Sequence, residues 1–598
     1  MKKLIYIFLS FLILLFFFWH ALWNYDKIGL GDWDSELSHY YIHMKSLFGY
    51  QQVLLWDPWI CGGKNGFAIT GLKEFGLTIL MSSFLPFLLA IKLSLLFHFL
   101  FAFLGFYLFN TKVVENKNIL PPLIISSLFV LNGSMIKHLE EGHLVFLPIC
   151  LFPLLFTVLE VGLKEKKISY AILASFLMAS FFYSGTTYPL VHLFSLLVVY
   201  FLFKFIFSPG KKYFIVFCGT FALISLSLSS AKILLAYDHL SQFNIVRSYA
   251  ASEYFPLYGI WQSFISPIPH SIGKWGWHER SFYIGSTGVF LLGFGLFILF
   301  PLRLIKRKTI LTEVIFLLTA VLSFFMIIGA YSPNSLYTLS YSLPIFKSMQ
   351  VTGRWFFPFI FSSCIFLLFT LKELESLPTP NKLKKILPFG HFFLIGICSS
   401  LLYELYQANH QPIKNFSHNK LSWTEKLDER AKSPLYKNDF SIIENPSVYD
   451  YGARSSMLPM VIKNESSREC YSPLSRSQKT ITMGEDIVYL LNPSKLSKIS
   501  NIEFSPNKIT FDAQITKSEV LILNQNYSAY WYTKGHTVTQ IEGKPALLLK
   551  EGNYKGLSFY FWPKYLTMSL FLIFLGLFFS SVLLWSERKK ATALDNKL

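Results

Sequence analysis

Two carboxylates, Asp32 and Asp34, lie two residues apart in a short polar stretch between apolar segments. A carboxylate in such a place can act as a general base toward an acceptor hydroxyl, or its oxygens can hold a divalent cation such as Mg²⁺ or Mn²⁺. The alternative role is structural: Asp34 would cap a helix that begins near Ser35, with Asp32 in the preceding turn. The residues alone leave both roles open, so Asp34 and Asp32 are the candidate catalytic residues.

A second group of acidic and imidazole side chains follows further along the chain. It consists of His138, Glu140, Glu141 and His143. Carboxylates and imidazoles together can complete a metal site with the first loop, or orient a metal bound to a phosphate. The predicted metal ligands are Asp32, Asp34 and Glu141. A solvated loop with ordinary interfacial charges is the alternative.

Basic side chains at or inside apolar segments are candidates for contact with a lipid phosphate. Arg354 stands directly before an apolar segment, where a guanidinium can hold a phosphate with paired donors. An interfacial Arg that snorkels to water is the common alternative. Lys232 lies within an apolar stretch, and an ionisable residue at membrane depth usually faces a cavity.

The long loop from Tyr237 to Arg280 adds less specific phosphate contacts. These are Arg247, Lys274, His278 and Arg280. The predicted substrate- and lipid-phosphate-binding residues are Glu140, Glu141, His143, Arg354, Lys232 and His138.

The composition is that of a membrane protein. Charged residues make up 15% of the chain, against ~25% in soluble domains. Hydrophobic residues make up 53%, and the mean hydropathy is +0.43. Lys and Arg (54) outnumber Asp and Glu (35), which gives a net charge of +19. This excess need not indicate nucleic acid, because basic residues also gather in the cytoplasmic loops of membrane proteins.

About twelve apolar segments are long enough to cross a membrane as helices. They are 4–23, 90–110, 119–136, 145–163, 168–185, 187–207, 213–235, 283–302, 310–329, 355–371, 386–404 and 564–585. The first follows two lysines as a signal peptide would, but it is long and lacks a clear cleavage site, so we interpret it as a retained anchor. The apolar stretch 75–89 is brief and contains Pro86, so we expect a short helix on the outer surface there.

The loops between these segments alternate in charge. With Lys2 and Lys3 placed inside, every second short loop is basic, as the positive-inside rule requires. This pattern predicts a multi-pass protein with both termini in the cytoplasm. The other loops collect acidic, His and aromatic residues, which predicts a site at the outer face.

The chain divides into three predicted parts. Residues 1–404 form a transmembrane domain whose first outer loop spans about 24–74, and residues 563–598 form a last transmembrane helix with a cytoplasmic tail. Residues 405–562 are polar and are expected to form an outer domain. Its second half alternates like strands, so we expect a β-sandwich there. The residues predicted to share one face of a strand are Ile509, Phe511, Ala513 and Ile515.

The six cysteines show no metal-ligand or CxxC spacing. Four lie in apolar segments, and only Cys61 and Cys470 lie in polar ones. A Cys61–Cys470 disulfide is an open alternative, because spacing alone does not set the geometry of a disulfide.

Several stretches resemble bacterial YfhO-like membrane proteins, which belong to the GT-C superfamily of polyprenyl-phosphate-dependent glycosyltransferases. They are Gly31-Asp32-Trp33-Asp34, then Trp56-Asp57-Pro58-Trp59-Ile60-Cys61-Gly62-Gly63, and then Glu141-Gly142-His143 before Pro148. Residues 523–531, 550–554 and 561–563 are similar to that family's C-terminal outer β-domain, which leads into a last helix. The similarity follows the order of the chain over most of its length.

The resemblance implies a GT-C-like multi-span enzyme of the bacterial inner membrane whose active site faces outward. It would use a sugar carried on a polyprenyl phosphate, with a glycan, lipid or protein as acceptor. Asp34 or Asp32 would deprotonate the acceptor, which attacks the anomeric carbon with inversion.

The resemblance also assigns phosphate contacts. Glu140, Glu141 and His143 would lie near the donor phosphate, and Arg354 would contact the lipid phosphate. The chain departs from the family at Asp57, where Asn usually precedes the Pro. It departs again in the late outer loop, where the Arg-rich stretch of some relatives is reduced to Arg354.

Two other classes of function fit part of the sequence. A lipid or polysaccharide transporter or flippase would suit about twelve spans, but transporters tend to place polar groups at mid-membrane and to show half-repeats. Here the acidic groups gather in the outer loops and no repeat is visible. A non-catalytic envelope scaffold that binds glycan through its β-domain is the third class.

Overall fold

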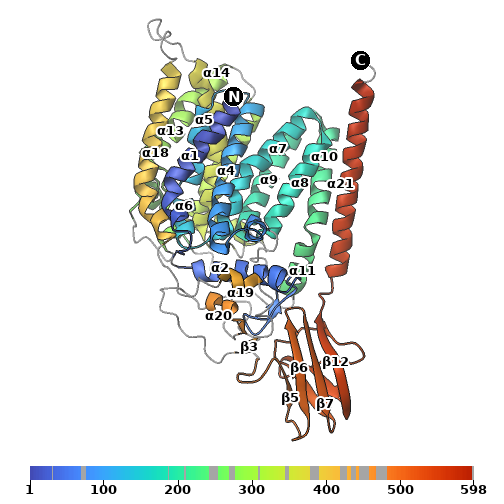
Figure 1. The fold of residues 1–598 in the computed structure, drawn as a ribbon. Coiled ribbons are helices and arrows are strands. Elements are labelled where there is room, and N and C mark those ends of the chain that lie inside the picture. The colour runs from blue at the N-terminus through green and yellow to red at the C-terminus, as the bar shows by residue number, and fades with distance from the viewer. Residues whose placement is uncertain are drawn as a thin grey trace.

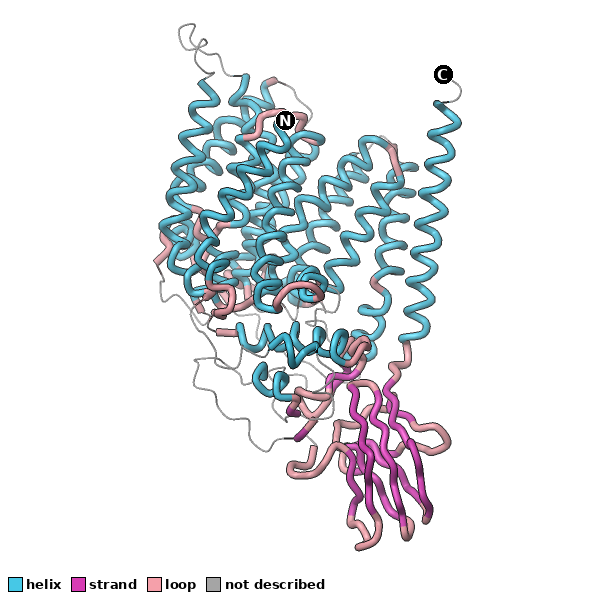
Figure 2. The backbone as a smooth tube through the Cα atoms, viewed as in Figure 1, coloured by secondary structure: helices cyan, strands magenta, loops and turns pink. Residues whose placement is uncertain are grey.

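The structure is a computed structural model, drawn in Figure 1. It describes the chain except for residues 30, 69–75, 186, 208–209, 242–252, 269–275, 307–309, 344–345, 347–348, 350, 377–388, 418–426, 433–439, 443–456, 467–480 and 596–598. A bundle of long helices forms the larger part, and a small β-domain extends beyond one end of it (Figures 1 and 2). Both termini lie at the opposite end of the bundle.

The described residues contain nine helical segments that are long and apolar enough to cross a membrane. They are α1 (Lys2–Trp23), α4 (Phe87–Lys112), η2 with α7 (Leu144–Leu151, Phe152–Glu165), α9 (Thr187–Phe207), α10 (Lys211–Leu228), α13 with η4 and α14 (Gly285–Phe294, Gly295–Leu299, Phe300–Ile305), α15 (Leu311–Ile328), η6 with α17 and η7 (Thr352–Trp355, Phe356–Leu371, Lys372–Ser376), and α21 (Leu566–Asp595). These segments make the chain a multi-pass membrane protein.

The predicted count of about twelve spans is only partly reached. Helices α5 (Leu120–Val130) and α6 (Gly133–Glu140) meet the length and composition test together but join at a bend of 41°, which brings the count to ten. Helix α8 (Ile168–Tyr183) is apolar but shorter than the others. Helix α18 (Phe389–Asn415) lies at another predicted position without being one of the nine.

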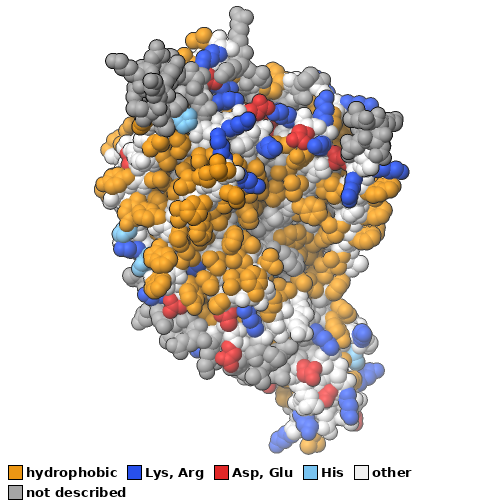
Figure 3. All heavy atoms as spheres, turned by 45° about the horizontal axis from the view of Figure 1, so that its top comes forward, with side chains coloured by type: hydrophobic (Ala, Val, Ile, Leu, Met, Phe, Trp, Pro, Cys, Tyr) orange, Lys and Arg blue, Asp and Glu red, His pale blue; other side chains and the backbone are white. Residues whose placement is uncertain are grey.

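The surface of the bundle carries a broad band of apolar side chains, with Lys and Arg gathered beyond it toward the end that holds the termini (Figure 3). An apolar band of this kind matches the hydrocarbon layer of a bilayer. The assignment of the termini to the cytoplasm remains a prediction.

Short helices cover the end of the bundle next to the β-domain, which we call the β-domain end. Helix α2 (Trp33–Met44) runs across the ends of the long helices in Figure 1. Within the stretch 75–89, predicted to form one short helix, the structure has the six-residue helix α3 (Leu77–Ser82). The end of the stretch differs from the prediction, because Pro86 stands at the N-cap of α4 and residues 87–89 begin that long helix. The other short elements include η1 (Lys45–Gly49), α11 (Ser230–Ser241), α12 (Leu257–Ile265), η3 (Trp277–Glu279), α16 (Leu336–Tyr341), α19 (Leu427–Lys432) and α20 (Met457–Lys463).

The β-domain consists of two four-stranded antiparallel sheets, in the orders β10-β11-β8-β5 and β6-β7-β12-β9. The strands are β5 (Val488–Leu491), β6 (Lys498–Ser505), β7 (Lys508–Ile515), β8 (Glu519–Leu523), β9 (Trp531–Tyr532), β10 (Thr539–Ile541), β11 (Lys544–Leu549) and β12 (Gly552–Phe561). The alternation predicted for β7 is confirmed, because all four residues of its predicted inner face are buried. Both sheets contribute side chains to one buried apolar cluster.

The β-domain is held to the first loop by amide side chains. The Trp56 indole N–H donates to Gln525 Oε1 at 2.9 Å. The Asn526 side-chain amide donates to the carbonyl oxygens of Cys61 (2.6 Å) and Gly63 (2.8 Å). Gly63 has a φ of +96°, and a Cβ there would lie 2.1 Å from Gln525 Oε1. The Trp- and Gly-rich stretch that follows Asp34 therefore anchors the β-domain to the bundle.

The first loop also contains a small hairpin, β1 (Trp56–Asp57) with β2 (Lys64–Asn65), and a bonded cysteine. Cys61 is disulfide-bonded. Cys470, the partner considered for it from the sequence, lies outside the described residues. The four cysteines of the apolar segments are free thiols: Cys150, Cys218, Cys364 and Cys398.

Candidate functional site

Two turns from distant parts of the chain meet at the β-domain end of the bundle, one before α2 and one after α6. The backbone N–H of Asp32 donates to the carbonyl oxygen of Glu141 at 2.7 Å. Gly142 has a φ of +90°, and a Cβ there would lie 2.5 Å from the Trp33 amide nitrogen. The buried Trp33 indole N–H donates to the Leu139 carbonyl oxygen at 3.0 Å. A glycine is therefore required for the two turns to approach this closely.

Asp32 stands at the N-cap of α2, but its side chain does not cap the helix. Its Oδ2 atom instead faces the Nε2 atom of His143 at 3.0 Å. The helix begins at Trp33, earlier than the predicted start near Ser35, so Asp34 lies inside the first turn and not at the cap. Both carboxylates are buried, at 6% and 5% exposure. The capping role proposed for Asp34 is therefore wrong, and capping explains neither carboxylate.

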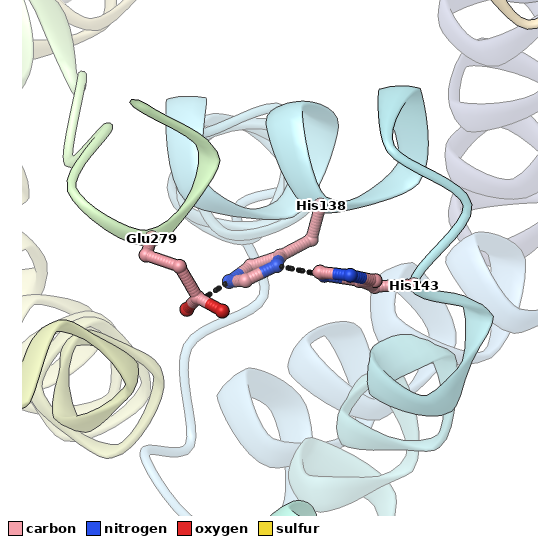
Figure 4. Close-up of side chains that lie close together, drawn as sticks. All are labelled: His138, His143 and Glu279. Carbon is pink, nitrogen blue, oxygen red and sulfur yellow. Dashed lines mark hydrogen bonds and ion pairs between the residues drawn. The ribbon is translucent and has the colours of Figure 1, made fainter. Parts of the chain in front are cut away.

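Two imidazoles and a second carboxylate continue from Asp32 (Figure 4). The Nδ1 atoms of His138, on α6, and His143, on the turn after it, are 2.9 Å apart. On its other side, His138 Nε2 lies 3.5 Å from Oε2 of Glu279, which η3 positions. Arg354 pairs with Glu279 from the far side. These five residues, Asp32, His143, His138, Glu279 and Arg354, form what we call the acid–imidazole cluster.

Arg354 forms paired hydrogen bonds with the Glu279 carboxylate. Its Nε atom donates to Glu279 Oε2 at 2.9 Å, and its terminal nitrogen makes a second, short contact with Oε1. The guanidinium carbon also lies 4.0 Å from the centre of the Tyr188 ring on α9. Burial by itself raises the pKa of Glu279, but Arg354 and His138 outweigh it and hold this pKa well below its usual range. Glu279 is therefore ionised at neutral pH.

A third imidazole lies at the edge of the cluster. His278 Nδ1 is 3.7 Å from Oε1 of Glu141, and its Nε2 is 3.7 Å from Oε1 of Glu279. Its ring centre lies 5.0 Å from that of His143. Glu141 is thus linked to the cluster through His278 as well as through its own backbone.

The contacts in the cluster determine how many protons it must hold. Three contacts join two imidazoles to each other and to two carboxylates: Asp32 to His143, His143 to His138, and His138 to Glu279. Two of these contacts are hydrogen bonds, and two neutral imidazoles supply both protons: His143 donates to Asp32, and His138 donates to His143. The third contact, between His138 Nε2 and Glu279, then has no proton, because burial holds the pKa of His138 well below its usual range. A bound cation would supply positive charge at that contact.

The position of the missing charge is consistent with a metal ion. His138, His143 and Glu279 each offer one ligand atom, and these atoms all lie within 4.8 Å of one another. His138 Nε2 is buried and makes no hydrogen bond among the described residues. Two imidazoles and one carboxylate suit Zn²⁺ or Mn²⁺ better than Mg²⁺, which prefers oxygen ligands. Arg354 would share Glu279 with such an ion.

The other predicted site residues lie in different surroundings. Glu140 pairs with Lys137 Nζ at 2.6 Å and accepts a short hydrogen bond from Asn415 on α18, so it ties α6 to its neighbours. Lys232, on α11, donates to the Phe67 carbonyl oxygen at 3.2 Å, in the segment after β2. Arg280 pairs with Glu253 at 3.2 Å. Arg247 and Lys274 lie outside the described residues.

Sequence reasoning missed Glu279, which joins His138 to Arg354. It lies between two residues that were considered, in Trp277-His278-Glu279-Arg280, within a long loop of mixed composition. The one local signal is an isolated acidic residue beside a His in a loop at the same face as the other candidates. That signal does not reveal which partner the carboxylate finds.

Comparisons with known proteins give limited similarity. No model of a protein family matches the sequence, and no curated protein matches it either. Among solved structures, the chain is similar to the apo oligosaccharyltransferase of Archaeoglobus fulgidus, with a TM-score of 0.46 and 12% identity over 79% of this chain and 65% of that one. It is also similar to the Archaeoglobus fulgidus oligosaccharyltransferase AglB in complex with an inhibitory peptide and a dolichol-phosphate. The TM-score is 0.44 and the identity 13%, over 78% and 64% of the two chains. This chain thus spans slightly less than two thirds of the length of those proteins.

Proposed function

We propose that this protein is an integral membrane glycosyltransferase of the GT-C type, related to the bacterial YfhO-like proteins. It moves a sugar from a polyprenyl-phosphate carrier to a glycan, lipid or protein acceptor at the outer face of the inner membrane. The observation that carries the proposal is the acid–imidazole cluster at the β-domain end of a membrane-spanning bundle. Buried carboxylates beside imidazoles and a guanidinium combine a base with groups that suit a phosphate.

The two aspartates take different roles in this proposal. Asp32 accepts a hydrogen bond from His143, so this carboxylate already has an imidazole partner. We therefore assign proton abstraction to Asp34, two residues further along the chain, in the first turn of α2. Asp32 positions His143. The acceptor hydroxyl loses its proton to Asp34 as its oxygen bonds to the anomeric carbon. The bond from that carbon to the carrier phosphate breaks on the opposite side, which inverts the configuration.

The remaining residues of the cluster act on the donor. His138, His143 and Glu279 would hold a divalent cation, which supplies positive charge to the phosphate as it leaves. Arg354 fixes the Glu279 carboxylate with paired hydrogen bonds. Glu141 and His278 lie at the edge of the cluster, where they can orient the sugar or the phosphate.

The test is sugar transfer from polyprenyl-phosphate donors by the full chain in membranes, with wild type compared with Asp34→Asn and Asp32→Asn. Glu115→Gln is the matched control, since Glu115 is an exposed carboxylate outside the cluster that pairs with Lys164 in the last turn of α7. We expect Asp34→Asn to lower kcat about 10²-fold or more and the control to retain full activity.

Two outcomes would contradict the proposal in different ways. Full transfer by both Asn variants would remove the base assignment while keeping the enzyme. Absence of transfer from every polyprenyl-phosphate sugar tried, by wild-type protein that elutes as a folded species, would reject the enzyme. Lipid scrambling by the same protein in liposomes would then favour the transporter.

A further inference from the structure

A buried histidine near the β-domain end of α9 is not used by the acid–imidazole cluster. His192 is 0% exposed, and neither of its ring nitrogens has a hydrogen-bond partner among the described residues. Its ring centre lies 5.0 Å from that of Trp355. The Trp355 indole N–H is buried as well, and it too has no partner in the described part of the chain. Buried polar atoms are normally paired, so two unpaired groups side by side indicate a polar ligand between or beside them.

An apolar groove begins at Trp355, next to His192. It has a volume of about 150 Å³ and lies between α9, α15, α16 and the start of α17. Its lining includes Leu196, Val199, Met326, Phe346 and Trp355. Leu196 is four residues after His192, so both lie on the same face of α9.

The hydroxyl groups of the groove do not make it polar. Ser195 donates to the Val191 carbonyl oxygen at 2.9 Å, and Thr319 donates to the Ile315 carbonyl oxygen at 2.7 Å. Each hydroxyl is therefore satisfied by its own helix. None of the described residues that line the groove is charged.

The polar end of the groove leads to the acid–imidazole cluster. Tyr188 lies one turn before His192 on α9, and its ring covers the Arg354 guanidinium at 4.0 Å. Arg354 is also the chain neighbour of Trp355. The groove thus combines unpaired N–H groups and a nearby cation at one end with apolar walls inside membrane-spanning helices. This arrangement is complementary to an anionic head group attached to an apolar chain.

We propose that His192 and Trp355 are positioning residues that bind the phosphate of the polyprenyl carrier, and that the groove holds the isoprene units next to that phosphate. The identity of the carrier rests on the proposed function. Arg354 is held by Glu279, so the direct hydrogen bonds to the phosphate come from the His192 ring and the Trp355 indole, while Arg354 adds positive charge nearby. The sequence assigned the lipid-phosphate contact to Arg354, which lies against Tyr188 on α9. The proposal moves this contact to Trp355 and to His192, one turn after Tyr188 on the same helix.

The test uses the full chain in nanodiscs with a photoreactive polyprenyl phosphate that carries no sugar. Cross-linked peptides are mapped by mass spectrometry, and affinity is measured by competition with unlabelled polyprenyl phosphate. The variants are Trp355→Phe and His192→Phe, which keep an aromatic ring, and Val199→Trp, which fills the groove. The control is Ile397→Trp in a second apolar groove, between α13 and α18, lined by Phe290 and Phe393.

We expect labels on α9, α16 and the segment around Trp355. Trp355→Phe and His192→Phe should each weaken binding about tenfold, because each removes a hydrogen bond to a charged group. Val199→Trp should abolish labelling of these segments, and Ile397→Trp should leave it unchanged. In transfer assays, the two Phe variants should raise the donor KM by the same factor and change kcat little, which a purely structural defect would not do.

Three results would overturn the inference. They are labels confined to other helices, equal affinity of wild type and both Phe variants, and equal competition by phosphatidylglycerol, which would make the groove a general phospholipid site. Thermal unfolding of each variant identifies any that fails to fold, and Ser195→Leu then replaces Val199→Trp as the groove-filling change. Binding of the carrier without transfer of any sugar would reject the proposed function and leave this inference standing.

Discussion

Asp32 and His143 are joined by a hydrogen bond of 3.0 Å between Asp32 Oδ2 and His143 Nε2, although 111 residues separate them in the chain. The bond assigns a proton to Nε2 of His143, because the ionised carboxylate can only accept. The lone pair of a neutral His143 then lies on Nδ1, toward His138. Asp32 thus sets the tautomer of the first imidazole and, through it, the direction of the second.

The Nε2 atom of His138, which has no hydrogen-bond partner among the described residues and lies beside the ionised Glu279, predicts that a divalent cation binds the cluster. Zn²⁺ and Mn²⁺ should bind the purified protein more tightly than Mg²⁺, because two of the three ligands are imidazoles. Titration calorimetry measures the affinity for each metal.

His138→Gln and Glu279→Gln should each weaken this metal binding at least tenfold. His536→Gln, a change at a half-buried histidine of the β-domain, outside the cluster, serves as the control. Unchanged binding in both cluster variants would show that the metal binds at another site.

Loss of Arg354 should destabilise the protein strongly, because it leaves the buried Glu279 carboxylate without its main partner. We expect Arg354→Gln to lower the free energy of unfolding by about 3–5 kcal/mol. The double variant with Glu279→Gln should recover part of that loss, since no buried charge is then left alone. Thermal unfolding midpoints in detergent measure both effects. Simple addition of the two single effects would contradict this coupling.

Gly142→Ala should disrupt the meeting of the two turns. The new Cβ would lie 2.5 Å from the Trp33 amide nitrogen at a φ of +90°. Gly535→Ala is the matched control, because that residue has a φ of +78° but nothing within 4 Å of the added atom. The control reports backbone strain alone, about 1–2 kcal/mol. Gly142→Ala should lower the unfolding midpoint further and weaken metal binding, and equal effects of the two changes would refute a steric role.

Asp57 should make stability depend on pH in the acid range. Burial raises its pKa to about 6, although Lys64, at 3.9 Å, opposes the rise. Between pH 4 and 6 the unfolded chain has already lost this proton while the folded protein keeps it, so stability falls as pH rises through this window. The loss levels off above about pH 6 and amounts to about 3 kcal/mol.

Asp57→Asn, which restores the residue usual in the resembling family, should remove this contribution. The test compares unfolding midpoints of wild type and variant from pH 4 to 8. A difference between the two that stays constant across that range would mean that Asp57 does not titrate there.

Part of this architecture follows from local patterns in the chain. Long apolar runs predicted most of the helices that can cross a membrane, because the thickness of a bilayer sets both their length and their composition. Alternation predicted the buried face of β7, from Ile509 to Ile515, because side chains of a strand point to opposite faces in turn.

Two other features of the structure could not be predicted from the local pattern of the sequence. The helix after the first turn starts at Trp33 and not near Ser35, because Asp32 takes the cap position while its carboxylate turns toward His143. The stretch from Trp56 to Gly63, part of the predicted first outer loop, is buried against amides of the β-domain. In both cases the partner lies far away in the chain.

The sequence by itself determined that this is a multi-pass membrane protein with a β-rich domain, and that its acidic and imidazole residues fall in loops. Only the tertiary structure decided that Asp32, His143, His138, Glu279 and Arg354 touch one another. The reason is physical: apolar length and alternation act along the chain, whereas hydrogen bonds and ion pairs join whichever loops the packing of the helices brings together. The sequence of each loop carries its chemistry but not the identity of its neighbour.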